Sequence, residues 1–457
     1  MYFGLHTKEI ELQIAPVDLY SVLSEQSETT FLLESAEGTA KKARFSFLGF
    51  SPSKKIVFEN KRIRVDEEEF DTRNPLEFLK QEISVSNAPT TVCPFIGGAV
   101  GYVSFEYIHY LEKLQTSLQI TDELSFPDFE FGIFDDCIVY DHKENTVRYM
   151  YTKENRLDEM YSFIKDATFD NEQFEMYNKK CTVSKDQFCK NVARAKEYIL
   201  QGDVFQTVLS KRYDLKFKGS LLPFYKKLKA INPSPYMYYL KFKDRQVIGS
   251  SPENLVRVEG NIIKSYATLA GTRPRGKTPE EDKQLEIELL TDEKEKAEHL
   301  MLVDLTRNDI GKVAKPGTVS VPELMKIQKY SHVQHISSLV EGILQEGRDA
   351  YDAFNAIFPA GTVSGAPKVR ALEIIRELEK TKRGPYGGAV GYFSRNGNCD
   401  FAIGIRTLFA NKNKAYIQTG AGIVYDSIAE KEFEETENKA QALLHAVGDE
   451  KYEALIT

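Results

Sequence analysis

The sequence lacks the features that would place the chain in a membrane, outside the cell or on a nucleic acid. No apolar run reaches the roughly 18 residues of a transmembrane helix, and the first residues, MYFGLHTKEIEL, do not have the pattern of a signal peptide. The net charge is -8 and no cluster of lysine and arginine offsets it, which argues against a general nucleic-acid binder. We therefore expect a cytoplasmic protein that binds neither membranes nor nucleic acids.

Cysteine is scarce, and its spacing offers no metal site. Neither a CxxC pair nor a Cys/His spacing suggests zinc among the five scattered cysteines, which are Cys93, Cys137, Cys181, Cys189 and Cys399. Their odd number and their scatter fit free thiols in a reducing cytosol. Internal repeats and low-complexity tracts are also missing from the sequence.

What remains is the composition of an ordinary soluble globular protein, with 42% apolar and 28% charged residues in a chain of 457. Residues 1–150 have the pattern of short strands between turns, and residues 151–184 are charged with little periodicity. Residues 185–457 combine long antiparallel strand runs with clustered helices. The pattern predicts an α+β fold with an N-terminal domain over 1–150, a charged linker segment over 151–184 and a second domain over 185–457.

Three stretches of the second domain have strong helix signals. Ser184–Gly202 has apolar residues at helical spacing, Ala366–Lys380 has a proline suited to its first turn, and Ala429–Val447 is a long closing helix. After the first of these helices, Val204–Ser210 has the pattern of a strand.

The stretch Gly271–Thr278 matches the phosphate-binding pattern G-x-x-x-x-G-K-[ST] letter for letter. Such a loop binds phosphate through successive backbone N–H groups, and Pro274 removes one of them. The alternating βαβ units that a phosphate-binding loop needs are also missing. We therefore interpret the stretch as a structural turn, followed by a charged helix with Asp292 at its start.

That charged helix carries two carboxylates three residues apart, Glu295 and Glu298, which therefore share one face. The closing helix repeats the spacing with Glu432 and Glu435. Mg²⁺ prefers a few carboxylates together with waters and a substrate oxygen, so two such pairs meeting across a cleft would suit it. The alternative is that both are ordinary solvated helices, and the spacing alone does not decide between the two.

Other residues point to a small anionic substrate. Arg406 stands within an apolar strand, where an unpaired guanidinium is expensive, so we expect a carboxylate of the protein or of a substrate beside it. The glycine-rich turns Gly361–Pro367, which includes Thr362, and Thr419–Gly422 can present N–H groups to an anion or can be tight turns only.

Two further residues have a catalytic and a structural interpretation. Glu253 follows a strand and is either a general acid with a raised pKa or the cap of a turn. His335 lies in an apolar context and is either a catalyst or a core histidine. Residue patterns alone therefore predict an enzyme that uses Mg²⁺ and a small carboxylate substrate, without defining the reaction.

Taken together, the motifs resemble those of the chorismate-utilising enzymes. They follow the order of that family over residues 185–445, and FLLES and NPSPYMYYL extend the match; the others are GDVFQTVLSKR, SSPENLVRV, ATLAGTRPRG, DEKEKAEHLMLVDLTRND, YSHVQHISS, FPAGTVSGAPKVRALEII, GPYGGAVGY, FAIGIRTL, TGAGIVYDS and EKEFEETENKAQALL. The resemblance implies a large sandwich of antiparallel sheets with flanking helices. It also implies that chorismate binds in the second domain, residues 185–457.

The same resemblance implies roles for single residues. Glu298 and Glu435 are expected to bind Mg²⁺, with Glu295 and Glu432 beside them, and the ion is expected to hold the ring carboxylate of chorismate. The enolpyruvyl carboxylate is expected to be held by Tyr386, Arg406 and the backbone of Gly420, Ala421 and Gly422. Glu253 is expected to be the general acid that helps the C4 hydroxyl leave, with His335 and Thr362 close to that group.

Two positions select a branch of the family. Members that add water are expected to have a lysine base where this chain has Gln206, and a neutral amide cannot deprotonate water. Aminodeoxychorismate synthases often have a lysine nucleophile where this chain has Ala270, in the loop that continues to Thr272, and alanine leaves room for ammonia to attack C2. The expected reaction is amination at C2 with loss of the C4 hydroxyl, then elimination of pyruvate to give anthranilate for tryptophan biosynthesis. Component I of an aminodeoxychorismate synthase, in the folate pathway, is the alternative.

Two stretches resemble the pocket in which anthranilate-forming members bind tryptophan as a feedback inhibitor. Aromatic and methionine side chains suit an indole ring, and a serine suits an amino-acid head; the residues are Leu33, Glu34, Ser35, Asn232, Pro233, Ser234, Tyr236 and Met237. The chain itself contains no tryptophan. No glutaminase nucleophile motif is present, so a separate glutamine amidotransferase subunit is expected to supply ammonia. A catalytically silent tryptophan-binding protein is a third interpretation, against which the intact acidic residues and His335 speak.

Overall fold

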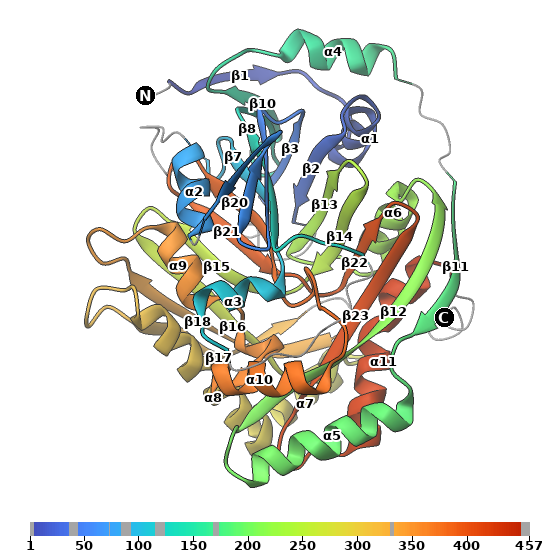
Figure 1. Cartoon of the computed structure of the whole chain (residues 1–457), viewed down its shortest axis with the longest axis vertical. Helices are drawn as coiled ribbons and strands as arrows, with labels where there is room; N and C mark the ends of the chain where they lie inside the picture. The colour runs from blue at the N-terminus through green and yellow to red at the C-terminus, as the bar shows by residue number, and fades with distance from the viewer. Residues whose placement is uncertain are drawn as a thin grey trace.

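The chain forms two large antiparallel β-sheets with helices around them (Figure 1). The computed structural model describes residues 4–35, 44–72, 74–83, 93–114, 124–167, 173–329 and 333–448, and for residues 267–272 and 333 it describes the backbone alone. The architecture confirms the α+β sandwich that the sequence predicts.

The long strands β12 and β23 pair near one edge of the first sheet. In spatial order its strands are β1 (His6–Ile10), β10 (Thr146–Tyr151), β9 (Asp136–Asp141), β3 (Phe45–Phe50), β2 (Thr29–Glu34), β13 (Tyr236–Phe242), β14 (Arg245–Ser251), β22 (Thr407–Asn411), β23 (Lys414–Ile423), β12 (Gln206–Gly219) and β11 (Phe174–Cys181). The short strand β19 (Gly365–Ala366) pairs with the beginning of β12.

The second sheet faces the first. In spatial order its strands are β17 (Ser320–Lys329), β18 (Val333–Ile343), β16 (Ile262–Pro274), β15 (Asn254–Glu259), β21 (Cys399–Ile403), β20 (Ala389–Ser394), β7 (Gly98–Val103), β8 (Phe129–Phe134), β4 (Lys54–Glu59), β5 (Arg62–Val65) and β6 (Glu68–Asp71). Residues 271–274 continue β16, which pairs with β18, so the stretch that matches a phosphate-binding loop begins in a strand.

Both sheets contain strands from the two halves of the chain. Strand β2 pairs with β13 in the first sheet, and β7 pairs with β20 in the second. The expected boundary near residue 150 therefore does not separate one sheet from the other. The expected linker also contains regular structure: its residues include α4, and Arg156 just before α4 forms an ion pair with Asp136 of β9 at 2.5 Å.

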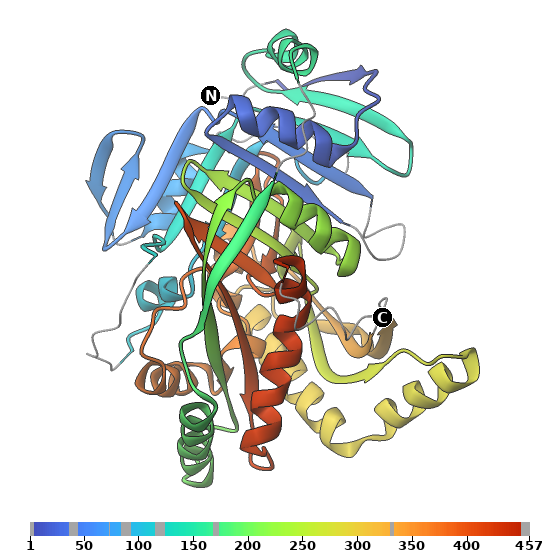
Figure 2. The ribbon, with the colours of Figure 1, turned by 90° about the vertical axis from the view of Figure 1, so that its right-hand side faces the viewer.

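The helices lie on the outer faces and at the ends of the sheets. They are α1 (Pro16–Gln26), α2 (Pro75–Glu82), α3 (Ile108–Leu111), α4 (Leu157–Lys165), α5 (Lys185–Leu200), α6 (Leu222–Ile231), α7 (Pro279–Thr291), α8 (Glu293–Gly311), α9 (Ala350–Ile357), α10 (Lys368–Leu378) and α11 (Ala429–Ala446), with short 3₁₀ turns η1 (Phe105–Tyr107) and η2 (Gly361–Val363). Helix α11, red in Figure 2, stands lengthwise beside the long strands of the first sheet, and the yellow helices α7 and α8 lie to one side.

Local capping explains where the functional helices begin. The Asp292 side chain accepts hydrogen bonds from the backbone N–H groups of Lys294 and Glu295, as predicted for the first residue of the charged helix. Ser184 caps α5 in the same way through Gln187. Pro367 precedes α10 as its cap residue, one position earlier than the predicted first turn.

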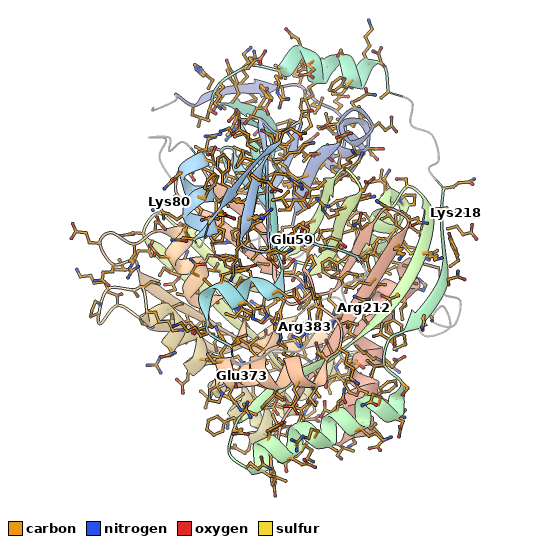
Figure 3. The ribbon with its side chains drawn as sticks, viewed as in Figure 1. Glu59, Lys80, Arg212, Lys218, Glu373 and Arg383 are labelled. Atoms are coloured by element: carbon orange, nitrogen blue, oxygen red, sulfur yellow. The ribbon has the colours of Figure 1, made fainter. Side chains whose placement is uncertain are left out.

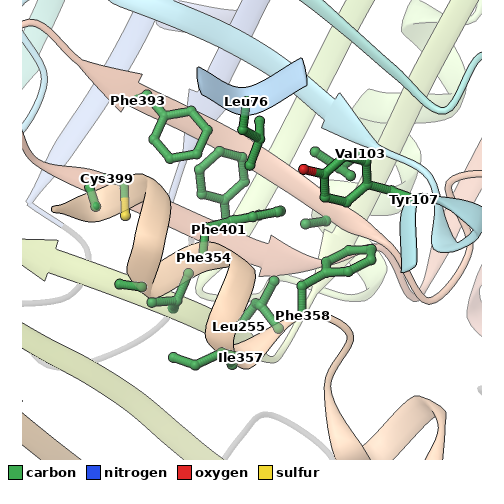
Figure 4. Packing of buried hydrophobic residues seen from close by; sticks show 14 of the residues in the cluster. Leu76, Val103, Tyr107, Leu255, Phe354, Ile357, Phe358, Phe393, Cys399 and Phe401 are labelled. Atoms are coloured by element: carbon green, nitrogen blue, oxygen red, sulfur yellow. The ribbon is translucent and has the colours of Figure 1, made fainter. Parts of the chain in front are cut away.

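Two apolar layers position the helices and sheets. Between the sheets lies a cluster to which both contribute, with Phe31 and Tyr238 from the first sheet and Val100 and Tyr392 from the second. Outside the second sheet, α9 packs onto β15, β20 and β21, and Figure 4 shows its Phe354, Ile357 and Phe358 among Leu255, Phe393 and Phe401. This packing holds the beginning of β15, where Glu253 is the preceding residue.

The described helices include none that is long and apolar enough to cross a membrane. All five cysteines are free thiols.

Candidate active site

Glu253 lies in the tight turn between β14 and β15, and 3% of the residue is exposed. Burial raises the pKa of its carboxyl group to about 8, and the nearby Thr362 hydroxyl and Lys439 ammonium oppose the shift by smaller amounts. The carboxyl group is therefore protonated at neutral pH, which is the state that a general acid needs.

Thr362 shares a cavity of about 20 Å³ with Glu253, and Leu302 and Leu305 of α8 form part of its wall. A space of this size holds about one water molecule. The Thr362 hydroxyl is buried, and among the described residues it has no hydrogen-bond partner in normal geometry. It lies close enough to Glu253 to lower the pKa of that carboxyl group.

Arg406 lies between β21 and β22 with a φ of 52°, in the left-handed region that non-glycine residues rarely adopt. Its carbonyl oxygen accepts a hydrogen bond from the backbone N–H of Ser250 at 3.1 Å. Burial lowers the pKa of its guanidinium, while Tyr386 and Glu435 act in the opposite direction. Among the described residues Arg406 forms no ion pair, so its half-buried charge is compensated only in part, by the longer-range effect of Glu435.

The predicted substrate-binding residue Tyr386 acts on the charge of Arg406 and lies against Gly420. Tyr386 is 3% exposed, and a Cβ atom on Gly420 would lie 2.8 Å from its hydroxyl oxygen, so only glycine fits there. A Cβ atom on Gly422 would come closer still to the side-chain amide nitrogen of Gln206. The side chain of Ala421 instead packs into the apolar cluster under α5, which leaves only its backbone on the side of the site.

The four predicted metal-binding carboxylates lie on two helices, with Glu295 and Glu298 on α8 and Glu432 and Glu435 on α11. Burial raises the pKa of Glu298 to about 7; Lys294 opposes this, and the charges of the other three carboxylates add to it. Burial also raises the pKa of Glu295 and of Glu432, and Glu435 contributes in both cases. The structure thus brings the two pairs within electrostatic reach of each other.

Whether these residues suit Mg²⁺ follows from their chemistry and number. In the described part of the chain, no three His, Cys, Asp or Glu side chains are already grouped as ligands of one ion. Mg²⁺ is commonly held by one or two carboxylates, with waters and substrate oxygens completing its shell. Oxygen donors that carry an excess of negative charge suit such an ion, so the residues present fit it.

Lys439 of α11 is a site residue that the sequence reasoning missed. Its ammonium lies 2.6 Å from Glu435 and donates a hydrogen bond to the carbonyl oxygen of Gly420 at 3.0 Å. It also lowers the pKa of Glu253 and of Glu432. In the sequence this lysine stands in a highly charged helix, where a solvated side chain is the ordinary expectation.

Arg383 is a second residue that the sequence reasoning missed, and it joins two segments of the candidate site. Its side chain is 2% exposed, and Figure 3 shows it in the interior of the molecule. The guanidinium pairs with Glu379 at 2.7 Å and donates hydrogen bonds to the carbonyl oxygens of Val363, at 2.7 Å, and Val208, at 2.8 Å. It therefore ties the turn that carries Thr362 to strand β12, which carries Gln206.

The motif order and this geometry agree with the comparison of the sequence with protein families. A profile described as chorismate binding enzyme matches residues 28–445. The chain belongs to the chorismate-binding enzymes. Two curated relatives, both named anthranilate synthase component 1, are similar over nearly their whole length. The protein of Methanothermobacter thermautotrophicus is 46% identical, and the match covers 94% of this chain and 92% of the relative. The protein of Aquifex aeolicus is 43% identical, and the match covers 97% of this chain and 94% of the relative.

Solved structures agree on the fold. Anthranilate synthase component I from Streptococcus pneumoniae matches with a TM-score of 0.81 and 37% identity, over 94% of this chain and 97% of that chain. MenF, the menaquinone-specific isochorismate synthase from Escherichia coli, matches with a TM-score of 0.73 over 98% of this chain and 95% of that chain, at 18% identity, which is a likeness of fold alone. The resemblance to chorismate-utilising enzymes that the motifs predict is confirmed.

Three predicted positions of this chorismate-binding enzyme lie on the paired strands β16 and β18. His335 is buried on β18, in register with residue 272 of β16 and with Gln328 of β17. The side chains of Ala270 and Thr272 lie outside the described residues. The roles expected of these three residues stay predictions.

A cavity of about 760 Å³ is lined by residues of both sheets. Cavities of this size bind small molecules. Of the residues predicted for tryptophan, those that line it are Leu33, Glu34, Ser35, Tyr236 and Met237. Arg257 and Asp400, which the sequence reasoning missed, line it as an ion pair 2.6 Å apart.

The other predicted tryptophan positions precede β13 and do not line this cavity. The Asn232 amide donates to Ser250 Oγ at 2.9 Å, and Ser250 Oγ donates to Ser234 Oγ, also at 2.9 Å. Pro233 lies in the same turn, and Pro235 lines the cavity in its place. The Glu34 carboxylate accepts hydrogen bonds from Tyr225 and Lys229, so its charge is already compensated.

Proposed function

We propose that the chain converts chorismate and ammonia to anthranilate and pyruvate, as the large component of an anthranilate synthase. The observation that carries the proposal is the half-buried guanidinium of Arg406, which has no ion-pair partner among the described residues and lies within electrostatic reach of Tyr386. A dicarboxylate such as chorismate supplies that partner, because a guanidinium binds a carboxylate through two parallel N–H groups. The relatives of the same name, 43% and 46% identical, support the reaction.

Glu253 acts as the general acid in this proposal. Its carboxyl group is protonated at neutral pH and gives its proton to the C4 hydroxyl, which leaves as water while ammonia forms a bond to C2. The carboxylate that remains is stabilised by the Lys439 ammonium and the Thr362 hydroxyl. Elimination of pyruvate then completes the aromatic ring.

Gln206 suits ammonia better than water as the nucleophile. Its carbonyl oxygen is buried without a hydrogen-bond partner among the described residues, and its amide covers Gly422. The oxygen can accept a hydrogen bond from ammonia, which needs no base to attack. A neutral amide cannot deprotonate water, so an isochorismate-forming reaction is not proposed.

Mg²⁺ is the proposed cofactor. Glu298 and Glu435 would hold it, with Glu295 and Glu432 beside them, and the like charges of these four residues favour a cation among them. When bound, the ion would supply positive charge for the ring carboxylate of chorismate. Lys439 and Lys294 offset part of the negative charge in the protein itself.

The cavity of about 760 Å³ is the proposed site of feedback inhibition by tryptophan. Met237, Tyr236 and Tyr392 offer apolar and aromatic surface to an indole, and Ser35 offers polar groups to the amino-acid head. The neighbouring Arg257 and Asp400 provide both signs of charge for a zwitterion.

A glutamine amidotransferase subunit is the proposed partner. The relatives are named component 1, which implies a further component, and the sequence has no glutaminase nucleophile of its own. We propose that the chain works in the cytoplasm, where its five free cysteines remain reduced.

Identification of the product tests this function. The purified chain would be incubated with chorismate, Mg²⁺ and an ammonium salt, and the products separated and weighed by mass spectrometry. Anthranilate and pyruvate are expected. A 4-amino-4-deoxychorismate product would instead make the chain a component I of aminodeoxychorismate synthase, and unchanged chorismate would contradict both activities.

A further inference from the structure

Asn254 stands between the small cavity at Glu253 and two residues that line the large cavity between the sheets. Asn254 lines the small cavity together with Glu253. Its side-chain amide donates hydrogen bonds in the other direction, to the hydroxyl oxygen of Tyr236 at 2.8 Å and to the carboxylate of Asp400 at 3.2 Å. Tyr236 and Asp400 both line the large cavity. Asn254 therefore belongs to the lining of the small cavity and hydrogen-bonds to two residues that line the large one.

The groups around Asn254 form a closed network on the side of the large cavity. The Tyr236 hydroxyl donates to Asp400 at 2.9 Å, and Arg257 pairs with the other oxygen of Asp400 at 2.6 Å. The Asn254 amide also donates to the carbonyl oxygen of Phe401 at 3.3 Å. Its own carbonyl oxygen is buried without a partner among the described residues, so the side chain is held by its NH₂ group.

The backbone transmits the position of Asn254 to Glu253. The two residues are consecutive, and the pairing of β15 with β21 shifts register between Asn254 and Val256, which is the geometry of a β-bulge. Bulges re-aim the side chains beside them. Two hydrogen bonds hold the backbone of Glu253 itself. Its carbonyl oxygen accepts one from the N–H of Ile403 at 3.0 Å, and its N–H donates one to Ser251 Oγ at 3.3 Å.

We propose that Asn254 is a positioning residue for Glu253, and that it makes the position of Glu253 depend on what occupies the large cavity. The inference rests on the proposed function, in which Glu253 is the general acid. An occupant that hydrogen-bonds to Tyr236 or Asp400 competes with the Asn254 amide for the same oxygens. The amide then moves, and Glu253 moves with it. A displacement of about 1 Å at a catalytic group can cost on the order of 100-fold in rate.

Two variants break this connection at different points. Asn254→Ala removes the amide and leaves both cavities lined by their other residues. Tyr236→Phe keeps the ring in the wall of the large cavity but removes the oxygen to which the amide donates. Tyr239→Phe is the matched control, because it removes a buried tyrosine hydroxyl of the same strand that bonds to Gln246 and lines neither cavity.

The probe for the large cavity is L-tryptophan. The chain contains no tryptophan of its own, so the fluorescence of the added amino acid, excited where tyrosine does not absorb, reports its binding without background from protein tryptophan. Each variant would be assayed for tryptophan binding in this way, for kcat and KM with chorismate and ammonium, and for residual activity at saturating tryptophan. Thermal unfolding would show that each variant is folded.

Asn254→Ala is expected to lower kcat about tenfold or more with KM for chorismate nearly unchanged, which is the pattern of a lost transition-state contact. Tyr236→Phe is expected to bind tryptophan yet to retain clearly more activity than the wild type when saturated with it. Tyr239→Phe should match the wild type in all three measurements.

Two results would overturn the inference while the proposed function stands. One is an active wild type whose Asn254→Ala and Tyr236→Phe variants behave like Tyr239→Phe. The other is a higher KM with unchanged kcat in Asn254→Ala, which would make the residue a plain part of the substrate wall. A wild type that makes no anthranilate would overturn the proposed function, and this inference with it.

Discussion

The Lys439 ammonium lies 2.6 Å from the carboxylate of Glu435, the residue that precedes it by one turn of α11. The same ammonium donates a hydrogen bond to the carbonyl oxygen of Gly420 on β23 at 3.0 Å. One ammonium thus joins a candidate metal ligand to the backbone proposed to hold the substrate carboxylate. Its charge also reaches Glu253 and lowers the pKa of that carboxyl group. The lysine therefore links the three parts of the proposed mechanism.

Lys439→Gln should impair catalysis and shift its pH dependence. We expect kcat/KM to fall about tenfold, which corresponds to roughly 1.4 kcal/mol. Because the ammonium lowers the pKa of Glu253, its removal should move the alkaline limb of the pH profile to higher pH. Lys431→Gln, an exposed lysine of the same helix, is the control for the loss of one charge. An unmoved alkaline limb in Lys439→Gln would contradict the electrostatic link.

Glu253→Gln should lower kcat by about 100-fold or more, because an amide has no acidic proton to donate. In the wild type the protonated form prevails below a pH of about 8, so kcat/KM should fall as the pH rises through that value. The variant should lack this limb. A variant with the wild-type rate at neutral pH would show that Glu253 is not the acid.

The same carboxyl group makes stability depend on pH. Its pKa of about 8 in the folded chain lies above that of an exposed glutamate, so between the two values the folded chain holds a proton that the unfolded chain has lost. The stability that comes from this proton is complete at low pH and is lost as the pH rises toward 8. Denaturant unfolding at several pH values should therefore show the wild type losing stability relative to Glu253→Gln over this range.

Removal of the metal should abolish activity reversibly. A chelator is expected to stop anthranilate formation and added Mg²⁺ to restore it, and Glu298→Gln should raise the Mg²⁺ concentration for half-maximal rate about tenfold or more. Glu434→Gln, an exposed position on α11 outside the two pairs, is the control. Full activity in the presence of excess chelator would refute the metal assignment.

Ser35→Phe should weaken tryptophan binding. Ser35 lines the cavity of about 760 Å³, and a phenyl ring there would occupy the space proposed for the ligand. We expect the dissociation constant, measured from the fluorescence of the added tryptophan, to rise about tenfold or more, and inhibition to weaken in parallel. Ser35→Ala, which keeps the space open, should change binding much less. Equal affinity in Ser35→Phe and the wild type would place the inhibitor elsewhere.

Local signals in the sequence predict several helices well, and they single out candidate residues that the structure brings near one another. The cap at Asp292 and the period of the closing helix follow from short-range chemistry, and the structure has both. The apolar stretch around Arg406 predicts a cation that needs an anion, and the structure shows it half-buried without an ion pair in the described chain. It lies between β21 and β22, however, and not within one strand as expected. These features depend on neighbours a few residues away.

Features that depend on distant contacts escaped prediction. The pairing of β2 with β13 and of β7 with β20 joins strands from the two halves of the chain, and no local pattern encodes which distant edges meet. Lys439 looks like one more charge on a solvated helix until its approach to Gly420 is known. Asn254 has no sequence signal at all, because its role follows from the two cavities on either side of it.

The rate of anthranilate formation by the wild type and by Arg406→Gln tests the central claim most directly. Both would be supplied with chorismate, Mg²⁺ and an ammonium salt, and the fluorescence of anthranilate followed, with Arg406→Lys as a variant that keeps the charge but not the planar fork. We predict a rate that saturates with chorismate in the wild type, and a KM for chorismate that rises about tenfold or more in Arg406→Gln and less in Arg406→Lys. A wild type that forms no anthranilate, or an Arg406→Gln variant with unchanged kinetics, would contradict the account.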